Sequence, residues 1–188
     1  MKILALEYGH SVESLDESMA CYPDSTLLRN NDDFYVPNFS KQIVSYIGIY
    51  LQFNKIGKCI EPRFANRYYS EIGCAIKFMA ADVIERNRQY GTATDIACGF
   101  DSSLAISNEK INCGITSFAA KFNGQLINVD VKIIDNIPEI LATATKYFTV
   151  KIGDLFFLPL THVSVPVSIG DVFDLSLNDK QLLTCSIK

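Results

Sequence analysis

The stretch QIVSYIGIYLQF at residues 42–53 decides the fold class, because it is rich in β-branched and aromatic residues and carries no helix cap. This composition predicts a long strand that is partly buried on both faces. The following segment, NKIGK at residues 54–58, is interpreted as the turn that ends this strand. Upstream, the short apolar run KILAL at residues 2–6 predicts a second, buried strand.

Helical and extended signals alternate after this turn. Phe64, Tyr68 and Ile72 recur at helical spacing, which predicts a helix that ends at Gly73. The apolar segment CAIKFMAADV at residues 74–83 fits either a strand or the start of a second helix, and its periodicity does not decide between them.

The C-terminal half predicts mainly β structure. Asn123-Gly124 lies between two apolar runs and indicates a hairpin. Residues 138–147 predict a short helix that begins at a proline. The tripeptide Ile-Gly-Asp occurs at residues 152–154 and 169–171, each time before an apolar run, which is typical of a turn leading into a strand.

Length, charge and composition limit the function classes. With 188 residues the chain is long enough for one domain with a core, so we expect a single domain over residues 1–188. The net charge of -4 argues against a nucleic-acid partner. No apolar run is long enough to span a membrane, so no membrane partner is expected. Glu7 interrupts the N-terminal apolar run too early for a secretory signal, which predicts a cytoplasmic protein.

Several short motifs occur, each at one place, in a fixed order along the chain. They are Phe39-Ser40, Asn54-Lys55-Ile56-Gly57-Lys58, Arg63-Phe64-Ala65, Tyr68-Tyr69, Glu71-Ile72-Gly73, Phe78, Gly99-Phe100-Asp101, Asn123-Gly124, the helix from Pro138, Phe148 to Asp154, and Ile169-Gly170-Asp171. In order and spacing they resemble the fumarylacetoacetate hydrolase family, especially its compact bacterial isomerase and hydrolase members. The resemblance covers nearly the whole chain, with residues 1–38 as a shortened N-terminal arm. It implies an α+β, mostly β fold, a mixed β-sheet roll with a few short helices, and usually a homodimer.

The resemblance also implies a chemistry that this chain does not retain. Members of the family act on 2-oxo acids and related dicarbonyl compounds, using Mg²⁺ or Mn²⁺ held by a Glu-x-Glu pair and a later Asp. The matching positions here are Tyr46, Gly48 and Lys77, and none of them is a carboxylate. A lysine ammonium has donors and no acceptor, and it repels a cation. We therefore expect no metal, no cofactor and no catalytic residue.

Other family motifs are altered too. Cys98 stands in place of a family lysine, and Ala81 in place of an arginine. The glycine-rich loop of the family corresponds here to Leu158–Val163, which contains His162. At the N-terminus the Asn-Tyr-x-x-His pattern is reduced to Glu7-Tyr8, with His10 one place early.

These matches define a vestigial pocket of Tyr46, Gly48, Lys77, Cys98, Asp101 and His162. Within it Asp101 either shapes the pocket or caps a turn, and Cys98 is interpreted as a small buried side chain rather than a nucleophile. An alternative register aligns Asp82, rather than Lys77, with the third metal ligand. That register requires a deletion before Phe100 and still leaves both glutamates missing.

Three hypotheses about function follow. The first is a non-catalytic pseudoenzyme, whose cleft is filled by Tyr46 and Lys77 or binds a small anionic ligand. The alternative is an active isomerase or hydrolase on small 2-oxo acid or dicarbonyl substrates, similar to 2-hydroxyhepta-2,4-diene-1,7-dioate isomerase, in which Lys77 acts as an electrophile or a Schiff-base amine. A third hypothesis is a partner subunit that regulates an active homologue.

Overall fold

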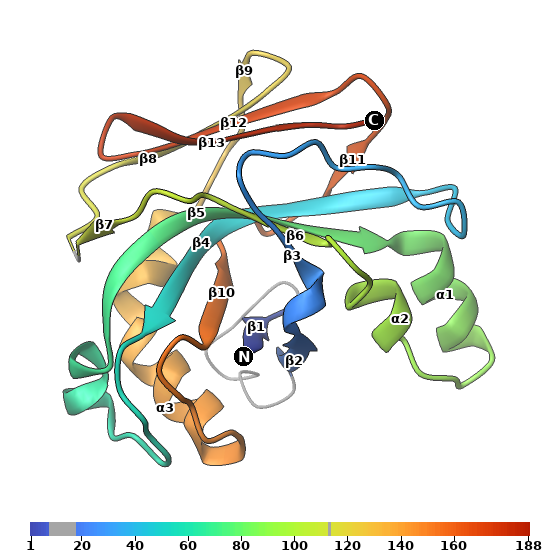
Figure 1. Ribbon diagram of the computed structural model, residues 1–188. Helices are drawn as coiled ribbons and strands as arrows, with labels where there is room; N and C mark the ends of the chain where they lie inside the picture. Colours follow the sequence, from blue (N-terminus) through green and yellow to red (C-terminus); the bar gives the residue numbers. More distant parts are fainter. Residues whose placement is uncertain (8–17, 113) are drawn as a thin grey trace.

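The computed structural model describes residues 1–7, 18–112 and 114–188, which form two β-sheets and a few short helices (Figure 1). The strands are β1 (Lys2–Leu6), β2 (Met19–Pro23), β3 (Leu27–Leu28), β4 (Ile43–Phe53), β5 (Tyr69–Ala80), β6 (Leu104–Ile106), β7 (Ile111–Asn112), β8 (Phe118–Phe122), β9 (Gln125–Leu126), β10 (Leu155–Pro159), β11 (Val165–Val167), β12 (Val172–Leu177) and β13 (Lys180–Ser186). The α-helices are α1 (Ala81–Gln89), α2 (Asp95–Cys98) and α3 (Ile137–Tyr147), and the 3-10 helices are η2 (Asp24–Thr26), η3 (Pro62–Arg67) and η4 (Val131–Asn136). None of the described helices is both long enough and apolar enough to cross a membrane.

The hairpin of β4 and β5 is the centre of the larger sheet. The main path of this sheet runs β2-β1-β10-β4-β5-β6-β3, with β11 beside β4 and β7 beside β5. Strands β1 and β10 are parallel, whereas β10, β4 and β5 are antiparallel to one another. Both long strands are strongly curved, so the sheet wraps around the region that holds β1 and β2 (Figure 1).

The second sheet, ordered β13-β12-β8-β9, packs on one face of β5 (Figure 1). Phe78 of β5 contacts Phe173 of β12, with ring centroids 6.4 Å apart, and stacks on Phe34 at 3.9 Å. Because side chains alternate along a strand, Lys77 points to the opposite face from Phe78. That opposite face holds the positions matched to the family's metal site.

The structure confirms the expected α+β, mostly β class and several of its parts. The stretch 42–53 forms β4, and residues 138–147 lie within α3. Asn123 and Gly124 have φ of 50° and 79° and join β8 to β9, as a two-residue hairpin turn requires.

The helix predicted as far as Ile72 is wrong in its second half. The 3-10 helix η3 ends at Arg67, and β5 begins at Tyr69. Ile72 pairs with Leu51 in the sheet and is buried there. Gly73 is an interior residue of β5, where a Cβ would lie 2.3 Å from the Tyr50 ring. Local helical spacing was therefore overridden by pairing with β4.

The shortened N-terminal arm, residues 1–38, contains regular structure. In its described part, β2 pairs along its whole length with β1, and β3 pairs with β6. Tyr8 and His10, the altered N-terminal motif, lie outside the described residues. For the ambiguous segment 74–83 the structure combines both alternatives, because β5 continues to Ala80 and α1 begins at Ala81.

The two Ile-Gly-Asp turns are closed by their aspartates. Asp154 is 2% exposed and accepts hydrogen bonds from the backbone nitrogens of Lys2 (3.0 Å) and Lys151 (2.8 Å), and its carboxylate also pairs with the Lys2 ammonium. Burial opposes ionisation of Asp154, but the hydrogen bonds from Lys2 and Lys151 outweigh it and lower the pKa. Asp171 accepts from the Ser168 nitrogen at 2.7 Å and from Asn123 Nδ2 at 2.8 Å.

Candidate functional site

Tyr46 and Lys77 are direct cross-strand partners on β4 and β5. Residues directly opposite each other in an antiparallel pair share one face of the sheet, and Gly48 shares that face because it is two residues from Tyr46. The pairing register therefore brings together the three positions that were aligned with the family's metal ligands.

The alternative residue, Asp82, is placed elsewhere. It lies in the first turn of α1, where its carboxylate accepts from Ser40 Oγ at 2.6 Å and from the Lys41 nitrogen at 2.9 Å. Burial raises the pKa of Asp82, but the hydrogen bonds from the Lys41 nitrogen, Ser40 Oγ and the Val83 nitrogen together outweigh it, so the pKa is lowered overall. Asp82 thus fastens the segment before β4, and it lies outside the strand pair that holds Tyr46 and Lys77.

Lys77 is buried, with 2% of its surface exposed, and its ammonium is held by oxygen atoms of the protein. Nζ donates to the carbonyl oxygen of Cys98, to Ser103 Oγ at 3.1 Å and to its neighbour's carbonyl, Phe78 O, at 3.3 Å. It also lies 4.6 Å from the centre of the Tyr22 ring, within range of a cation–π contact. These three hydrogen-bond acceptors suit a positive charge, and none of them is a carboxylate.

Glu7 is the anionic counterpart of Lys77 in this region. Both side chains line one small cavity, together with Leu6, Tyr46, Met79, Phe157 and Pro159. Burial lowers the pKa of Lys77 to about 8, and the nearby Glu7 carboxylate acts in the opposite direction. Burial likewise raises the pKa of Glu7, and the charge of Lys77 counteracts this. Within the described part of the chain, Glu7 Oε1 has no hydrogen-bond partner.

Among the described residues, the cavity beside Lys77 is small. Its volume is about 10 Å³, which is room for about one water molecule. Tyr46 closes one side, and its phenol forms a hydrogen bond with Ser164. Burial raises the pKa of Tyr46 despite this hydrogen bond, so the phenol is neutral at physiological pH.

Gly48 leaves no room for a side chain. A Cβ built on Gly48 would lie 2.1 Å from the carbonyl oxygen of Leu158 and 2.8 Å from Pro159 Cα, both in the backbone of β10. A glutamate at this position would therefore require β10 to move away from β4. Within residues 1–7, 18–112 and 114–188, moreover, no three His, Cys, Asp or Glu side chains are grouped so that they could hold a metal ion. The residues present do not fit the family's divalent cation.

Cys98 contacts Lys77 through its backbone carbonyl. It is the last residue of α2, its side chain is buried, and its carbonyl oxygen accepts the hydrogen bond from Lys77. The family resemblance implies a lysine side chain at position 98. In this chain the backbone carbonyl of that position instead accepts a hydrogen bond from Lys77 of β5.

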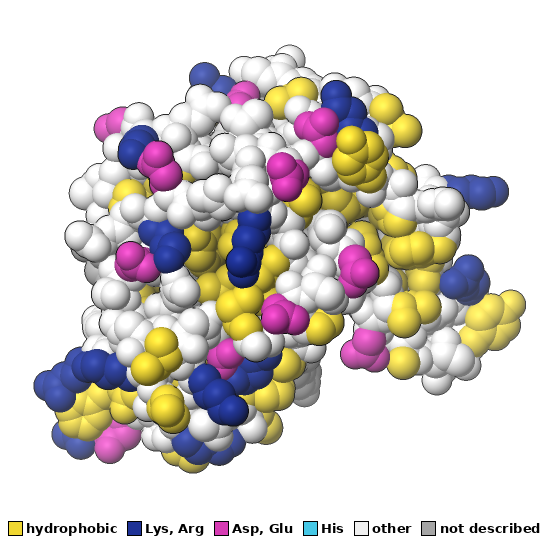
Figure 2. All heavy atoms as spheres, viewed as in Figure 1, with side chains coloured by type: hydrophobic (Ala, Val, Ile, Leu, Met, Phe, Trp, Pro, Cys, Tyr) yellow, Lys and Arg dark blue, Asp and Glu magenta, His cyan; other side chains and the backbone are white. Residues whose placement is uncertain are grey.

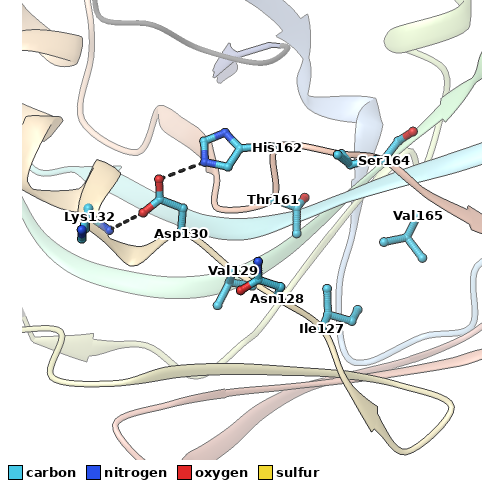
Figure 3. A pocket seen from close by; sticks show the side chains of 10 residues that line it. Ile127, Asn128, Val129, Asp130, Lys132, Thr161, His162, Ser164 and Val165 are labelled. Atoms are coloured by element: carbon cyan, nitrogen blue, oxygen red, sulfur yellow. Dashed lines mark hydrogen bonds and ion pairs between the residues drawn. The ribbon is translucent and has the colours of Figure 1, made fainter.

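Asp101 and His162 lie outside the Lys77 cavity. Asp101 is exposed and borders an apolar groove formed by Pro37, Phe39, Ile96, Gly99 and Phe100. His162 lines a larger groove of about 640 Å³ between the loop before β11 and residues 127–130 (Figure 3). Neither residue lines the cavity beside Lys77, so the structure does not assemble the six predicted positions into one pocket.

The groove at His162 contains an exposed hydrogen-bonded pair of side chains. His162 Nε2 is 2.9 Å from Asp130 Oδ2, and the two side chains point toward one another (Figure 3). The hydrogen bond from His162, followed by the one from the Lys132 nitrogen, lowers the pKa of Asp130. Thr161 is used structurally, because its Oγ1 accepts from the Ile47 nitrogen at 3.1 Å.

Three contributors to the site were missed by sequence reasoning: Tyr22, Ser103 and the charge of Glu7. Glu7 was interpreted as the end of the N-terminal apolar run and as part of an altered motif, although an acidic residue directly after a buried strand is also a signal for a buried charge. Ser103 and Tyr22 give no signal, because their relation to Lys77 depends on how α2 and β2 pack beside β5.

Solved structures provide the comparison for this geometry. A structure from Yersinia pestis, described as a fumarylacetoacetate hydrolase family protein, matches with a TM-score of 0.84 and 17% identity, over 100% of this chain and 92% of that one. Fumarylpyruvate hydrolase from Pseudomonas aeruginosa, in complex with Mn²⁺ and pyruvate, matches with a TM-score of 0.82 and 15% identity, over 99% of this chain and 88% of that one.

A third match is 5-carboxymethyl-2-hydroxymuconate delta-isomerase from Mycobacterium smegmatis, with a TM-score of 0.79 and 14% identity, over 99% of this chain and 78% of that one. No protein-family profile matches the sequence, and neither does any curated protein. The likeness at these identities concerns the fold, and it confirms the resemblance at that level: the chain has the mixed β-roll fold of the fumarylacetoacetate hydrolase family structures.

Proposed function

We propose that this chain is a non-catalytic relative of the enzymes that share its fold, and that the Lys77 ammonium takes the place of their divalent cation. The observation that carries the proposal is the set of contacts around Lys77 Nζ, which donates to three protein oxygens in a buried position. A positive charge that is part of the chain occupies the face where the family holds a metal. A second cation there would meet strong repulsion and no carboxylate pair.

The closed backbone at Gly48 supports the same proposal. Restoring a glutamate by substitution at Gly48 conflicts with the Leu158 carbonyl at 2.1 Å. The small cavity beside Tyr46 adds to this, since a 2-oxo acid is much larger than the single water molecule that fits there. The cleft is thus filled by the chain's own side chains, and Glu7 supplies the anion that a bound ligand would otherwise provide.

Metal binding tests the proposal directly. Titration of the protein with Mn²⁺, followed through the electron paramagnetic resonance signal of free Mn²⁺, is expected to show no stoichiometric binding. Lys77→Met is the matched variant, because it removes the repelling charge without adding a ligand, and it too should bind no Mn²⁺. One equivalent of Mn²⁺ bound tightly to the wild-type protein would refute the proposal.

A second candidate function is amine chemistry at Lys77, favoured by the lowered pKa of about 8. A neutral lysine amine forms Schiff bases with carbonyl compounds such as pyruvate or oxaloacetate. The burial of Nζ and the size of the cavity oppose this function. Borohydride treatment with pyruvate, followed by peptide mass spectrometry, separates the two candidates. An adduct on Lys77 would establish the amine function, and an unmodified Lys77 peptide supports the non-catalytic one.

The homodimer and the single domain over residues 1–188 also remain proposals. The match to the Yersinia pestis structure supports the single domain, because it runs over all of this chain and 92% of that one. Light scattering coupled to gel filtration measures the oligomeric state, and limited proteolysis measures whether any part of the chain is released as a separate unit.

A further inference from the structure

The end of the molecule opposite the start of β4 carries a local excess of positive charge. Residues 54–67 and 145–152, here named the basic tip, contain six of the 17 Lys and Arg residues and one of the 21 Asp and Glu residues. The six are exposed: Lys55, Lys58, Arg63, Arg67, Lys146 and Lys151. The acidic residue, Glu61, pairs with Arg63 at 2.8 Å. Since the whole chain carries a net charge of -4, the tip differs in sign from the rest of the molecule.

The two segments of the basic tip form one surface. An isolated antiparallel bridge joins Gly57 to Val150, and the Cys59 nitrogen donates to the Thr145 carbonyl at 2.9 Å. Lys58 Nζ reaches the Lys146 carbonyl at 2.8 Å, a contact that holds the side chain without neutralising its charge. Figure 2 shows Lys and Arg side chains gathered at the lower end of the molecule, over η3, the turn after β4 and the end of α3.

Large apolar side chains protrude among these charges. Ile56 is 67% exposed, Ile152 is 70% exposed and Tyr147 is 54% exposed. Ile56 lies on the turn between β4 and η3, and Ile152 lies on the turn before β10. Exposure of isoleucine side chains to water is energetically unfavourable. Exposed apolar side chains that lie in a group therefore mark interaction sites.

We propose that the basic tip is a peripheral docking surface for anionic lipid headgroups. Isoleucine and tyrosine side chains on turns can enter the boundary between headgroups and acyl chains, while lysine and arginine side chains contact the anionic phosphates around them. The guanidinium groups of Arg63 and Arg67 lie 4.6 Å and 4.8 Å from the Phe64 ring centre, which keeps both charges at this surface.

The side chains at the tip favour a lipid surface over other anionic partners. Four of the six cations are lysines, a residue type depleted in protein–protein interfaces. Single-stranded nucleic acid is bound with aromatic stacking platforms, whereas the two most exposed apolar side chains here are isoleucines. The expectation of no membrane partner rested on the lack of a spanning segment, which does not concern a surface contact made by one end of the molecule.

Vesicle sedimentation tests this proposal on the full chain. Vesicles of equimolar phosphatidylcholine and phosphatidylglycerol should sediment the protein, vesicles of phosphatidylcholine alone should not, and added salt should weaken the binding. The double variant Lys55→Ala/Lys151→Ala should bind about 25-fold more weakly, or about five-fold for each charge. Ile56→Ser/Ile152→Ser should weaken binding by about ten-fold or more, because it removes the inserted apolar area.

The matched control is Lys41→Ala/Lys121→Ala, which removes the same charge from two exposed lysines outside the tip. This control should bind anionic vesicles as the wild-type protein does. Absence of wild-type binding to anionic vesicles would overturn the proposal, as would equal losses in the two lysine variants. Loss of dimerisation in the tip variants, measured by sedimentation velocity, with vesicle binding unchanged, would assign the surface to a second copy of the chain and equally overturn it.

Discussion

Two buried charged residues, Asp154 and Lys77, differ in how the cost of burying their charge is compensated. The Asp154 carboxylate is neutralised by the Lys2 ammonium and accepts backbone hydrogen bonds from two segments of the chain. The Lys77 ammonium is surrounded chiefly by neutral acceptors, with Glu7 as its main electrostatic partner. Burial of a charge is costly unless it is paired and fully hydrogen-bonded, so the two sites should respond differently to removal of the charge.

The difference shows which motifs of the fold are structural and which are chemical. Asp154 belongs to an Ile-Gly-Asp turn that this chain retains, and its contacts close the start of β10 onto β1. Lys77 stands at a position where the family resemblance implies a metal ligand, and its side-chain ammonium takes no part in the backbone pairing with β4. The Asp154 side chain is thus part of the backbone hydrogen bonding that defines the fold, whereas the Lys77 side chain is not.

The largest expected effect is at Gly48, on the same face as Lys77. Gly48→Ala places a Cβ against the backbone of β10, so β4 and β10 must separate, and we expect a loss of about 3 kcal/mol in the free energy of unfolding. Urea denaturation measures it. Gly99→Ala is the comparison variant, because its nearest contact at 2.8 Å is with a ring atom of Tyr22 rather than with the backbone of a neighbouring strand, and a smaller loss is expected. If Gly48→Ala is as stable as the wild-type protein, the cleft has room that the filled-cleft proposal denies.

Asp154→Ala should be nearly as damaging. It leaves the backbone nitrogens of Lys2 and Lys151 without acceptors and the Lys2 ammonium without its partner, for an expected loss of about 3 kcal/mol. Because folding lowers the pKa of Asp154, this stabilisation is complete above the unfolded-state pKa and is lost as the pH falls through the folded-state pKa. The wild-type protein and the variant should therefore converge in stability in acid, and constant separation down to low pH would contradict this.

Lys77→Met should have a smaller effect that depends on pH. The folded-state pKa of about 8 lies below the ordinary value of 10.5, so between these values the unfolded chain binds more protons and the wild-type protein gains stability as the pH rises. The stability of the wild-type protein relative to Lys77→Met should thus increase by roughly 1–3 kcal/mol across this range. Urea midpoints of both proteins at pH 7 and pH 10 measure the difference, and a flat difference would mean that Lys77 is well solvated.

The smallest expected effect is at Asp171, in the second Ile-Gly-Asp turn. Asp171→Ala removes the acceptor of the Ser168 nitrogen and of Asn123 Nδ2, but the site is only partly buried and water can replace the carboxylate. We expect a loss of about 1 kcal/mol, measured by thermal denaturation. A loss as large as that of Asp154→Ala would show that the two turns are equally structural despite their different burial.

Much of this fold could be predicted from the sequence, because many strands and turns have short-range sequence signals. The β-branched composition of residues 42–53 and the Asn123-Gly124 turn are short-range signals, and both gave correct elements. The segment after Arg67 was misassigned because Phe64, Tyr68 and Ile72 satisfy a helical period by chance. Pairing with β4 makes this segment a strand, and such long-range pairing cannot be detected from the local sequence pattern.

The candidate site could be predicted only where strand geometry relates its residues. Tyr46, Gly48 and Lys77 came together as expected, because the spacing along β4 and the register with β5 fix them. Asp101 and His162 did not join them, since each lies on a segment whose path depends on packing. The contact between Lys77 and the Cys98 carbonyl was beyond prediction, because every residue has a carbonyl and only the position of α2 selects this one.

The near-contact between Gly48 and the Leu158 carbonyl has a consequence for any attempt to rebuild a metal centre on this scaffold. Carboxylates introduced at Tyr46 and Lys77 would still lack their third member until the neighbouring strand had been moved outward. Substitutions made one at a time would each lower stability before any ion could bind and compensate. An engineer would therefore have to redesign the backbone of β10 first and choose the ligands second.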